Sequence, residues 1–209
     1  MNLLSGDTAL AFFAASVLLA LVPGPDNVFV LLHAAVHGAR AGLLVVLGLC
    51  SGLLFHTAAV ALGLAALLAA SSTAFAVLKA LGAAYLLWLA WLSWRAPAGL
   101  PGGNAAPPLG ARQTYLRGVL INISNPKVAL FFLAFLPQFV EPTRGAVALQ
   151  ILQLGGVFML ATLLTFGAVA LLAGRFGQLL QDSPRAQVRL NRLASVVFAG
   201  LALKLVLGS

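Results

Sequence analysis

The chain has 209 residues, of which 62% are hydrophobic and 8% are charged, and its formal net charge at pH 7 is +8. An ordinary soluble domain carries about 25% charged residues, so this composition cannot build a water-exposed surface and predicts a lipid surrounding. The basic residues are scattered among the connections without interleaved aromatic residues, which argues against nucleic acid as a partner and indicates membrane topology instead.

Apolar blocks of about the length of a transmembrane helix recur along the sequence. We expect six, at about 3–22 (continuing past a break to 36), 41–70, 73–94, 115–140, 145–173 and 190–207. The first block follows no Lys or Arg and precedes no small-residue cleavage site, so we expect it to stay as a helix and not to be removed as a signal peptide. The sequence therefore predicts an all-α, multi-pass membrane protein with one domain over residues 1–209.

The first block is interrupted at residues 21–27, which read LVPGPDN. Proline cannot continue a helix, but it suits the first position of a new one, and glycine is a serviceable cap before it. We therefore expect one half-helix to end near Val22 and another to begin at Pro25, with Gly24 as its cap. The free N–H groups and the positive dipole end of the second half-helix then lie inside the membrane beside Asp26.

Histidines extend this candidate site. His33 and His37 follow Asp26 by seven and eleven residues, close to one helical face, and His56 lies near the middle of the second block. Asp26, His33 and His56 are candidates for proton coupling because histidine titrates near neutral pH, and simple packing is the alternative for the histidines. Two histidines and one distant acid are a thin ligand set, so we expect no metal and no other cofactor.

Glycines recur in the second block. Gly42, Gly48, Gly52 and Gly63 stand at small-residue spacings, which allow helices to approach closely in lipid. Tight packing within the chain is one explanation, and a homodimer face is the other.

Residues 96–113 hold four of the ten prolines and no apolar period, which is typical of a linker. The linker divides the chain into repeat 1 (about 1–95) and repeat 2 (about 114–209), with three helices expected in each. An odd number of spans in each half inserts the second half inverted relative to the first. Placing Pro25 over Pro126 aligns PGPDNVFVLLHAA with SNPKVALFFLAFL. In each stretch a proline and an ionisable residue precede what we expect to be an unbroken apolar helix, so each repeat has a broken first helix. Interruptions at corresponding positions of two inverted halves are typical of a transporter binding site.

The second break places Asn125 as a cap before Pro126, and Lys127 follows. A cation at a helix N-terminus is unfavourable, and an intramembrane charge costs about 2.5–3.5 kcal/mol on insertion scales, so an anion should lie near Lys127. That anion is Asp26, the substrate, or both. A buried Asp26–Lys127 ion pair that only joins the halves is the structural alternative to a functional site. The expected substrate site comprises Pro23, Gly24, Pro25, Asp26, Asn27, Asn125, Pro126 and Lys127.

The distribution of Lys and Arg predicts the orientation. One set of connections carries eight basic residues: Arg40, Arg95, Arg112, Arg117, Arg175, Arg185, Arg189 and Arg192. The opposite set carries two, Lys79 and Arg144. The first set should therefore face the cytoplasm, which leaves both termini outside if the spans are six.

Four stretches, in this order and spacing, resemble the LysE/RhtB family of bacterial amino-acid exporters: PGPDNVFVL, GARAGLLVVLGLCSG, LGAAYLLWLAW and INISNPKVALFFLAFLPQFV. The resemblance covers nearly the whole chain. It implies a six-helix protein of the bacterial inner membrane that expels amino acids, commonly driven by the proton gradient. Pro23, Gly24 and Pro25 match the P-G-P motif of the family, and Asn125, Pro126 and Lys127 match its N-P-K motif. Similar proteins often have Asp or Asn at the position of Asp26, which leaves the proton carrier open.

The function expected is therefore secondary active export of small neutral amino acids, coupled to protons. A neutral substrate is favoured because the chain has no cluster of acids to hold a second cationic group. Efflux of another small metabolite or of a metal cation is an alternative, and a non-transporting scaffold subunit is an alternative of a different class. No nucleophile, phosphate-binding or metalloprotease motif is present, so we do not expect an enzyme.

Overall fold

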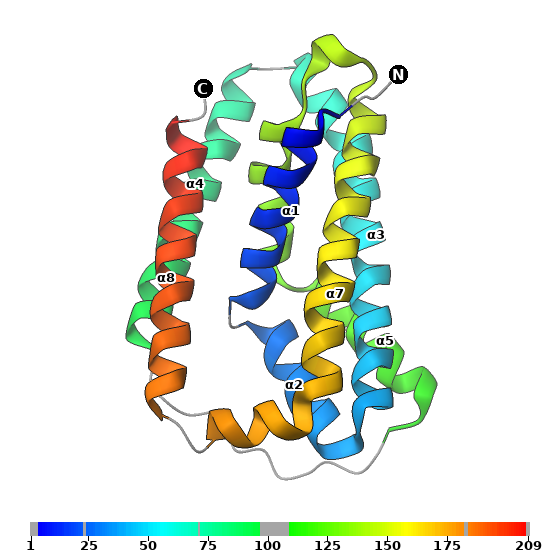
Figure 1. The fold of residues 1–209 in the computed structure, drawn as a ribbon. Helices are drawn as coiled ribbons and strands as arrows, with labels where there is room; N and C mark the ends of the chain where they lie inside the picture. The colour runs from blue at the N-terminus through cyan, green and yellow to red at the C-terminus, as the bar shows by residue number, and fades with distance from the viewer. Residues whose placement is uncertain (1–3, 23, 71, 97–108, 182–183, 208–209) are drawn as a thin grey trace.

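The computed structural model describes residues 4–22, 24–70, 72–96, 109–181 and 184–207, and every element among them is helical (Figure 1). In chain order the elements are α1 (Gly6–Leu21), α2 (Pro25–His37), α3 (Ala39–Ala70), α4 (Ser72–Arg95), α5 (Ala111–Ile123), α6 (Pro126–Leu130), the π-helical turn η1 (Phe131–Phe135), the 3₁₀ turns η2 (Leu136–Phe139) and η3 (Pro142–Arg144), α7 (Val147–Gln181) and α8 (Pro184–Leu207). The predicted all-α class is confirmed.

Both predicted helix breaks occur where the prolines place them. α1 and α2 are bent by 63° at the first break, and the α5 helix is bent by 48° from the segment Pro126–Phe139 at the second. The sequence predicted an unbroken helix after Pro126, which is wrong: α6 lasts little more than one turn before the π and 3₁₀ turns follow. Pro137 explains part of this irregularity, because it has no N–H with which to continue an α-helical ladder.

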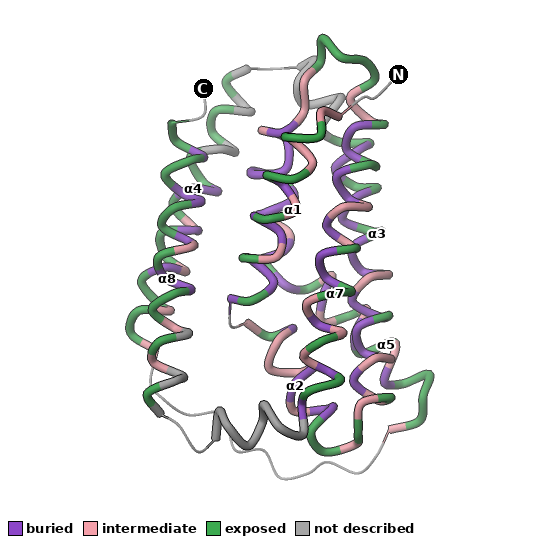
Figure 2. Tube along the Cα trace, viewed as in Figure 1, coloured by how far each residue is buried: buried purple, intermediate pink, exposed green. Residues whose placement is uncertain are grey.

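Two described helices are long and apolar enough to cross a membrane, α3 over Ala39–Gly63 and α7 over Val147–Ala173, and there are four such spans if each bent pair counts as one. Their outer faces carry large apolar side chains, and Leu62 is 80% exposed. Buried and exposed positions alternate along the long helices, so that each helix buries one face (Figure 2). Exposed apolar surface on this scale suits lipid and not water. The count of six spans stays a prediction.

The main helix contacts join the first half of the chain to the second. α3 packs on α5 and α7, α7 also packs on α1 and α2, and α4 packs on α8. α1 begins and α8 ends at one end of the molecule, while the α2–α3 turn, the end of α4 and the start of α8 lie at the other (Figure 1). Two apolar clusters form the core, one around Phe12, Phe131 and Phe198 and the other around Val30, Leu49 and neighbouring residues of α7.

The glycines of α3 permit close helix contacts within the chain. A Cβ atom on Gly48 would lie 2.2 Å from the Tyr115 carbonyl oxygen of α5, and one on Gly52 would lie 2.7 Å from the Asn122 side chain. Both positions face α5, so intramolecular packing accounts for them. A homodimer therefore stays a prediction that these two glycines do not support.

Candidate functional site

The end of α1 is held by side chains from beyond the break. Lys127 Nζ donates to the carbonyl oxygens of Leu19 (3.3 Å) and Val22 (3.2 Å), and Asn27 Nδ2 donates to that of Ala20. Carbonyl groups at the end of a helix have no partner within the helix, and inside a membrane they need one from elsewhere in the protein. The Lys127 cation therefore sits at the negative dipole end of α1 as well as in the first turn of α6. The sequence indicated only the unfavourable α6 dipole and gave no sign of this partner on α1.

The two breaks are joined directly. Asn125 caps α6 by accepting the backbone N–H of Lys127 at its Oδ1 (3.0 Å), and its Nδ2 donates to Asp26 Oδ1 (2.7 Å). A buried carboxylate is thus held against the start of each half-helix. α2 differs from α6, because Gly24 has no side chain and leaves the first N–H groups of α2 without a side-chain cap.

Asp26 and Lys127 do not form a salt bridge. Both side chains are buried, with 2% and 5% of their surface exposed, yet no charged nitrogen–oxygen pair of theirs lies within 4.0 Å. Lys127 instead donates two of its three N–H groups to α1, and the third has no acceptor among the residues that the structure describes. The ion pair that the sequence offered as the structural alternative is absent from this arrangement, and the two charges stay separately available.

α5 is held in a similar way by a residue of the other half. His56 on α3 places Nε2 3.2 Å from the Asn122 carbonyl oxygen near the end of α5. This contact puts the ring proton on Nε2. The side chain of Asn122 is 1% exposed, and its Oδ1 has no hydrogen-bond partner. A buried acceptor without a donor is costly, and Asn122 was not among the residues that the sequence singled out.

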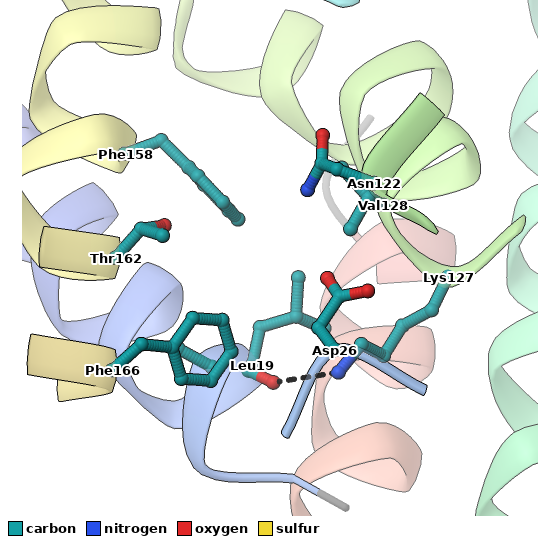
Figure 3. A pocket seen from close by; sticks show the side chains of 9 residues that line it. Leu19, Asp26, Asn122, Lys127, Val128, Phe158, Thr162 and Phe166 are labelled. Atoms are coloured by element: carbon teal, nitrogen blue, oxygen red, sulfur yellow. Dashed lines mark hydrogen bonds between the residues drawn. The ribbon is translucent and has the colours of Figure 1, made fainter. Parts of the chain in front are cut away.

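A small chamber lies beside these polar groups (Figure 3). Its volume is about 10 Å³, close to that of a single water-sized group. Asp26, Asn122 and Lys127 line it together with Thr162 and apolar side chains from both core clusters, including Leu19 and Phe166. The chamber therefore sits between the clusters, at the level of the breaks.

A larger cavity lies on the other side of Lys127. Its volume is about 390 Å³, and it is lined by both breaks, by α4 between Tyr85 and Ser93, by Ala96 just after α4, and by α8 at Asn191 and Phe198. The stretches of α4 and α8 that line it belong to the end of the molecule at which α8 begins (Figure 1). Lys127 lines both the chamber and the cavity and so stands between them.

Aromatic side chains fill the space on the opposite side of the breaks, toward the end at which α1 begins. Phe12 of α1 lies 5.0 Å from Phe139 between ring centroids, and Phe131 lies 5.3 Å from Phe158. All four rings are buried. The larger cavity and the packed rings thus lie on opposite sides of the breaks.

The remaining residues that the sequence singled out lie away from the chamber and the cavity or outside the described residues. His33 is stacked on Phe29 and lies 4.6 Å from the His37 ring, and neither histidine lines the chamber or the cavity. Pro23 lies outside the described residues. No group of three His, Cys, Asp or Glu side chains that could hold a metal occurs among the residues that the structure describes.

Comparison with known proteins identifies the family of the chain. The family model for the LysE type translocator matches residues 17–209, and the chain belongs to this family. It is 35% identical to an uncharacterized membrane protein of Vibrio cholerae over 94% of this chain and 95% of that one. No solved structure matches the chain.

Two further relatives carry functional names. A homoserine/homoserine lactone efflux protein of Salmonella typhimurium is 31% identical, with 90% of each chain covered. A leucine efflux protein of Klebsiella pneumoniae is also 31% identical, over 94% of this chain and 93% of that one. The resemblance seen in the sequence is thereby confirmed: the protein is a multi-pass translocator of the bacterial inner membrane, and not an enzyme.

Proposed function

We propose that the protein is a secondary exporter of neutral amino acids and that the substrate binds between the two helix breaks. One observation carries this proposal: Lys127 and Asp26 are both buried and line the same chamber without forming a salt bridge, and one N–H donor of Lys127 has no acceptor among the described residues. An amino acid carries one carboxylate and one ammonium group, and it needs a partner of opposite charge for each. Lys127 and the uncapped start of α2 suit the carboxylate, while Asp26 suits the ammonium group.

A neutral side chain fits the charges around the site. Among the described residues that line the cavity, Lys127 is the one charged residue, and Asp26 is the one acid that lines the chamber. A lysine or arginine substrate would bring a second cation with no acid to receive it. The two relatives named for efflux are named for homoserine or its lactone and for leucine, whose side chains are uncharged.

The proposal includes two inverted repeats, about 1–95 and 114–209, with three spans each. Exchanging the halves exchanges the broken helix α1–α2 with α5–α6, α3 with α7 and α4 with α8. The observed packing is compatible with that exchange, because α3 contacts α5 as α7 contacts α1 and α2, and α4 contacts α8. The crossed contacts at the breaks support it too: Lys127 of the second half holds the end of α1, and His56 of the first half holds the end of α5.

The side of the site with the larger cavity faces the cytoplasm in this proposal. The cavity lies toward the end of the molecule at which α4 ends and α8 begins, and the helix ends there carry Arg40, Arg95, Arg112 and Arg185, which the positive-inside rule assigns to the cytoplasm. The structure then corresponds to a state that loads substrate from inside the cell. Export requires the aromatic cluster on the far side to open as the halves rearrange.

Protons are the proposed coupling ion, with Asp26 as the carrier and His56 beside it. Asp26 lies between the α6 cap and the chamber, where its protonation would change the bond from Asn125 and the attraction of a substrate ammonium group. His33 is a weaker candidate because it packs among Phe29 and His37 and away from the chamber.

Export from cells tests the proposed function. Cells with and without the protein are fed a panel of dipeptides, and intracellular and extracellular amino acids are measured over time. We expect faster appearance of one or more neutral amino acids outside the cells that contain the protein. Unchanged amino-acid export would contradict the proposal and favour efflux of another metabolite or a scaffold role. If the efflux of every measured metabolite is unchanged, the non-transporting scaffold role is the explanation that remains.

A further inference from the structure

We propose that the cavity between the breaks and the α4–α8 pair holds the substrate side chain and selects large apolar amino acids. This inference rests on the proposed export function and narrows its substrate from neutral amino acids in general to those of about the size of leucine or phenylalanine. Tyr85 and Trp88 of α4 are the proposed specificity-determining residues.

The cavity has a polar pole and an apolar wall. Its pole is formed by the two breaks, where one N–H donor of Lys127 has no acceptor among the described residues and the start of α2 at Gly24 and Pro25 has no side-chain cap. Its wall is formed by side chains that are aromatic or aliphatic: Tyr85, Trp88, Leu89, Leu92 and Phe198. A ligand that suits this cavity has an anionic head and an apolar body.

The size and the polar groups of the cavity support the same substrate class. A volume of about 390 Å³ lies in the range of roughly 300–1,000 Å³ that small-molecule sites occupy, and it leaves room for a large side chain once the head is bound. Away from the pole, the polar side chains of the wall are few, and they include Ser93 near the end of α4 and Asn191 near the start of α8. A short hydroxylated side chain would find little to bond along the wall.

α4 provides a matched pair of tryptophans. Trp88 lines the cavity and is 50% exposed, while Trp91 is 51% exposed, does not line the cavity and lies beneath the Arg95 guanidinium at 4.6 Å. The two residues share a helix, a residue type and an exposure. A difference in KM between their alanine variants is therefore due to the position of Trp88 in the cavity, and not to the loss of a tryptophan from α4 in general.

The test measures exchange of labelled amino acids across proteoliposomes that contain the full chain. We expect leucine and phenylalanine to have a lower KM than alanine and homoserine. The Trp88→Ala and Tyr85→Ala variants should raise the KM for leucine about tenfold, which is the size of effect that apolar pocket contacts give, with little change for alanine. Trp91→Ala should change neither value.

A second measurement locates the ligand without relying on transport rates. Cys50 is the single native cysteine, so Ser93→Cys and Gln113→Cys are made in a Cys50→Ser background. Ser93 lines the cavity, whereas Gln113 is exposed on α5 outside it. We expect leucine to slow labelling of Ser93→Cys by a water-soluble maleimide and not to slow labelling of Gln113→Cys.

The outcomes separate the two proposals. The cavity inference is overturned, and the export function is not, if the protein exchanges alanine or homoserine in preference to leucine. The same holds if Trp88→Ala and Trp91→Ala raise the KM for leucine equally. Labelling of Ser93→Cys that leucine does not slow overturns the cavity inference as well. Exchange of no amino acid by the unmodified protein overturns both. Lower KM for the large apolar amino acids, together with protection at Ser93→Cys, supports both.

Discussion

Asn125 Nδ2 lies 2.7 Å from Asp26 Oδ1, and this hydrogen bond joins the starts of two half-helices that are 99 residues apart in the chain. The same Asn125 side chain accepts the backbone N–H of Lys127, so one amide caps α6 and orients the buried carboxylate of α2. The acid and the base are held near one another by Asn125, while Lys127 is anchored elsewhere on α1. This separation leaves each charge available for a zwitterionic substrate.

Asp26→Asn is predicted to uncouple transport from the proton gradient. The asparagine amide oxygen can accept the bond from Asn125 Nδ2 as the carboxylate does, so the local structure should persist while the titratable group is lost. Uptake into proteoliposomes driven by a pH gradient should be abolished, and exchange of substrate without a gradient should be reduced less. The matched control is Asp7→Asn, an exposed residue in the first turn of α1. Unchanged gradient-driven accumulation in Asp26→Asn would remove Asp26 as the proton carrier.

The sequence predicted the helix breaks because proline leaves few choices. Pro25 and Pro126 fix where α2 and α6 begin, and Asn125 is a strong cap, so both starts are confirmed at the residue predicted. The partner of Lys127 was beyond sequence reasoning, because it consists of backbone carbonyl groups more than 100 residues away. Backbone acceptors have no sequence pattern, and their availability depends on the bend between α1 and α2.

The residues that line the cavity could not be predicted from the sequence either. Tyr85 and Trp88 lie in an apolar helix next to Trp91 and Trp94, and nothing in the local pattern separates those that line the cavity from those that do not. Asn122 had a weak signal, since it is a polar residue within an otherwise apolar stretch of α5. Its proximity to Asp26 in the chamber depends on the packing of α5 against α3, which periodicity does not specify.

Lys127→Met is predicted to lower both stability and substrate affinity. It leaves the Leu19 and Val22 carbonyl oxygens without their donor, and each buried polar group left unpaired costs about 1–3 kcal/mol. The midpoint of thermal unfolding in detergent should fall by several degrees, since about 1 kcal/mol corresponds to roughly 2–4 °C for a chain of this size. Lys204→Met, at an exposed lysine of α8, serves as the control and should leave substrate affinity unchanged.

Lys127→Gln separates the two roles of this side chain. The amide keeps a donor for the end of α1 but has no charge, so it should recover part of the stability lost in Lys127→Met while binding substrate as weakly as that variant. Substrate affinity is measured by isothermal titration on the purified protein. An affinity for Lys127→Gln equal to that of the unmodified protein would exclude a role of the charge in holding the carboxylate.

Gly24→Ala is predicted to reduce substrate affinity and to destabilise the protein less than Lys127→Met does, because a shift of Lys127 Nζ weakens its bonds to α1 without removing them. A Cβ atom at this position would lie 2.9 Å from Lys127 Nζ, which is the far end of a flexible side chain and can move aside. Moving Nζ displaces the donor proposed for the carboxylate, and loss of a hydrogen bond to a charged group is worth about 1.5–3 kcal/mol, or roughly tenfold or more in KM. Gly110→Ala is a matched control, because Gly110 also caps a helix and nothing lies within 4 Å of its Cβ position. Equal KM values for the two variants would count against Lys127 as the carboxylate partner.

Gly48→Ala is predicted to disrupt the α3–α5 contact. The added Cβ would lie 2.2 Å from the Tyr115 carbonyl oxygen and 2.9 Å from the Val119 nitrogen, and both are backbone atoms of α5 that cannot rotate away. The helices must separate, and overpacking of this kind costs about 1–3 kcal/mol.

Gly63→Ala is the control for this prediction, because Gly63 lies on the same helix with no atom within 4 Å of its Cβ position. In helix propensity alone both substitutions should stabilise α3 by up to about 1 kcal/mol, so only the contact with α5 distinguishes them. Thermal unfolding in detergent should show a lower midpoint for Gly48→Ala and an equal or higher one for Gly63→Ala. Because α5 also positions Asn122 in the chamber, Gly48→Ala should in addition weaken substrate binding. A normal substrate affinity in a destabilised Gly48→Ala variant would show that the chamber tolerates movement of α5.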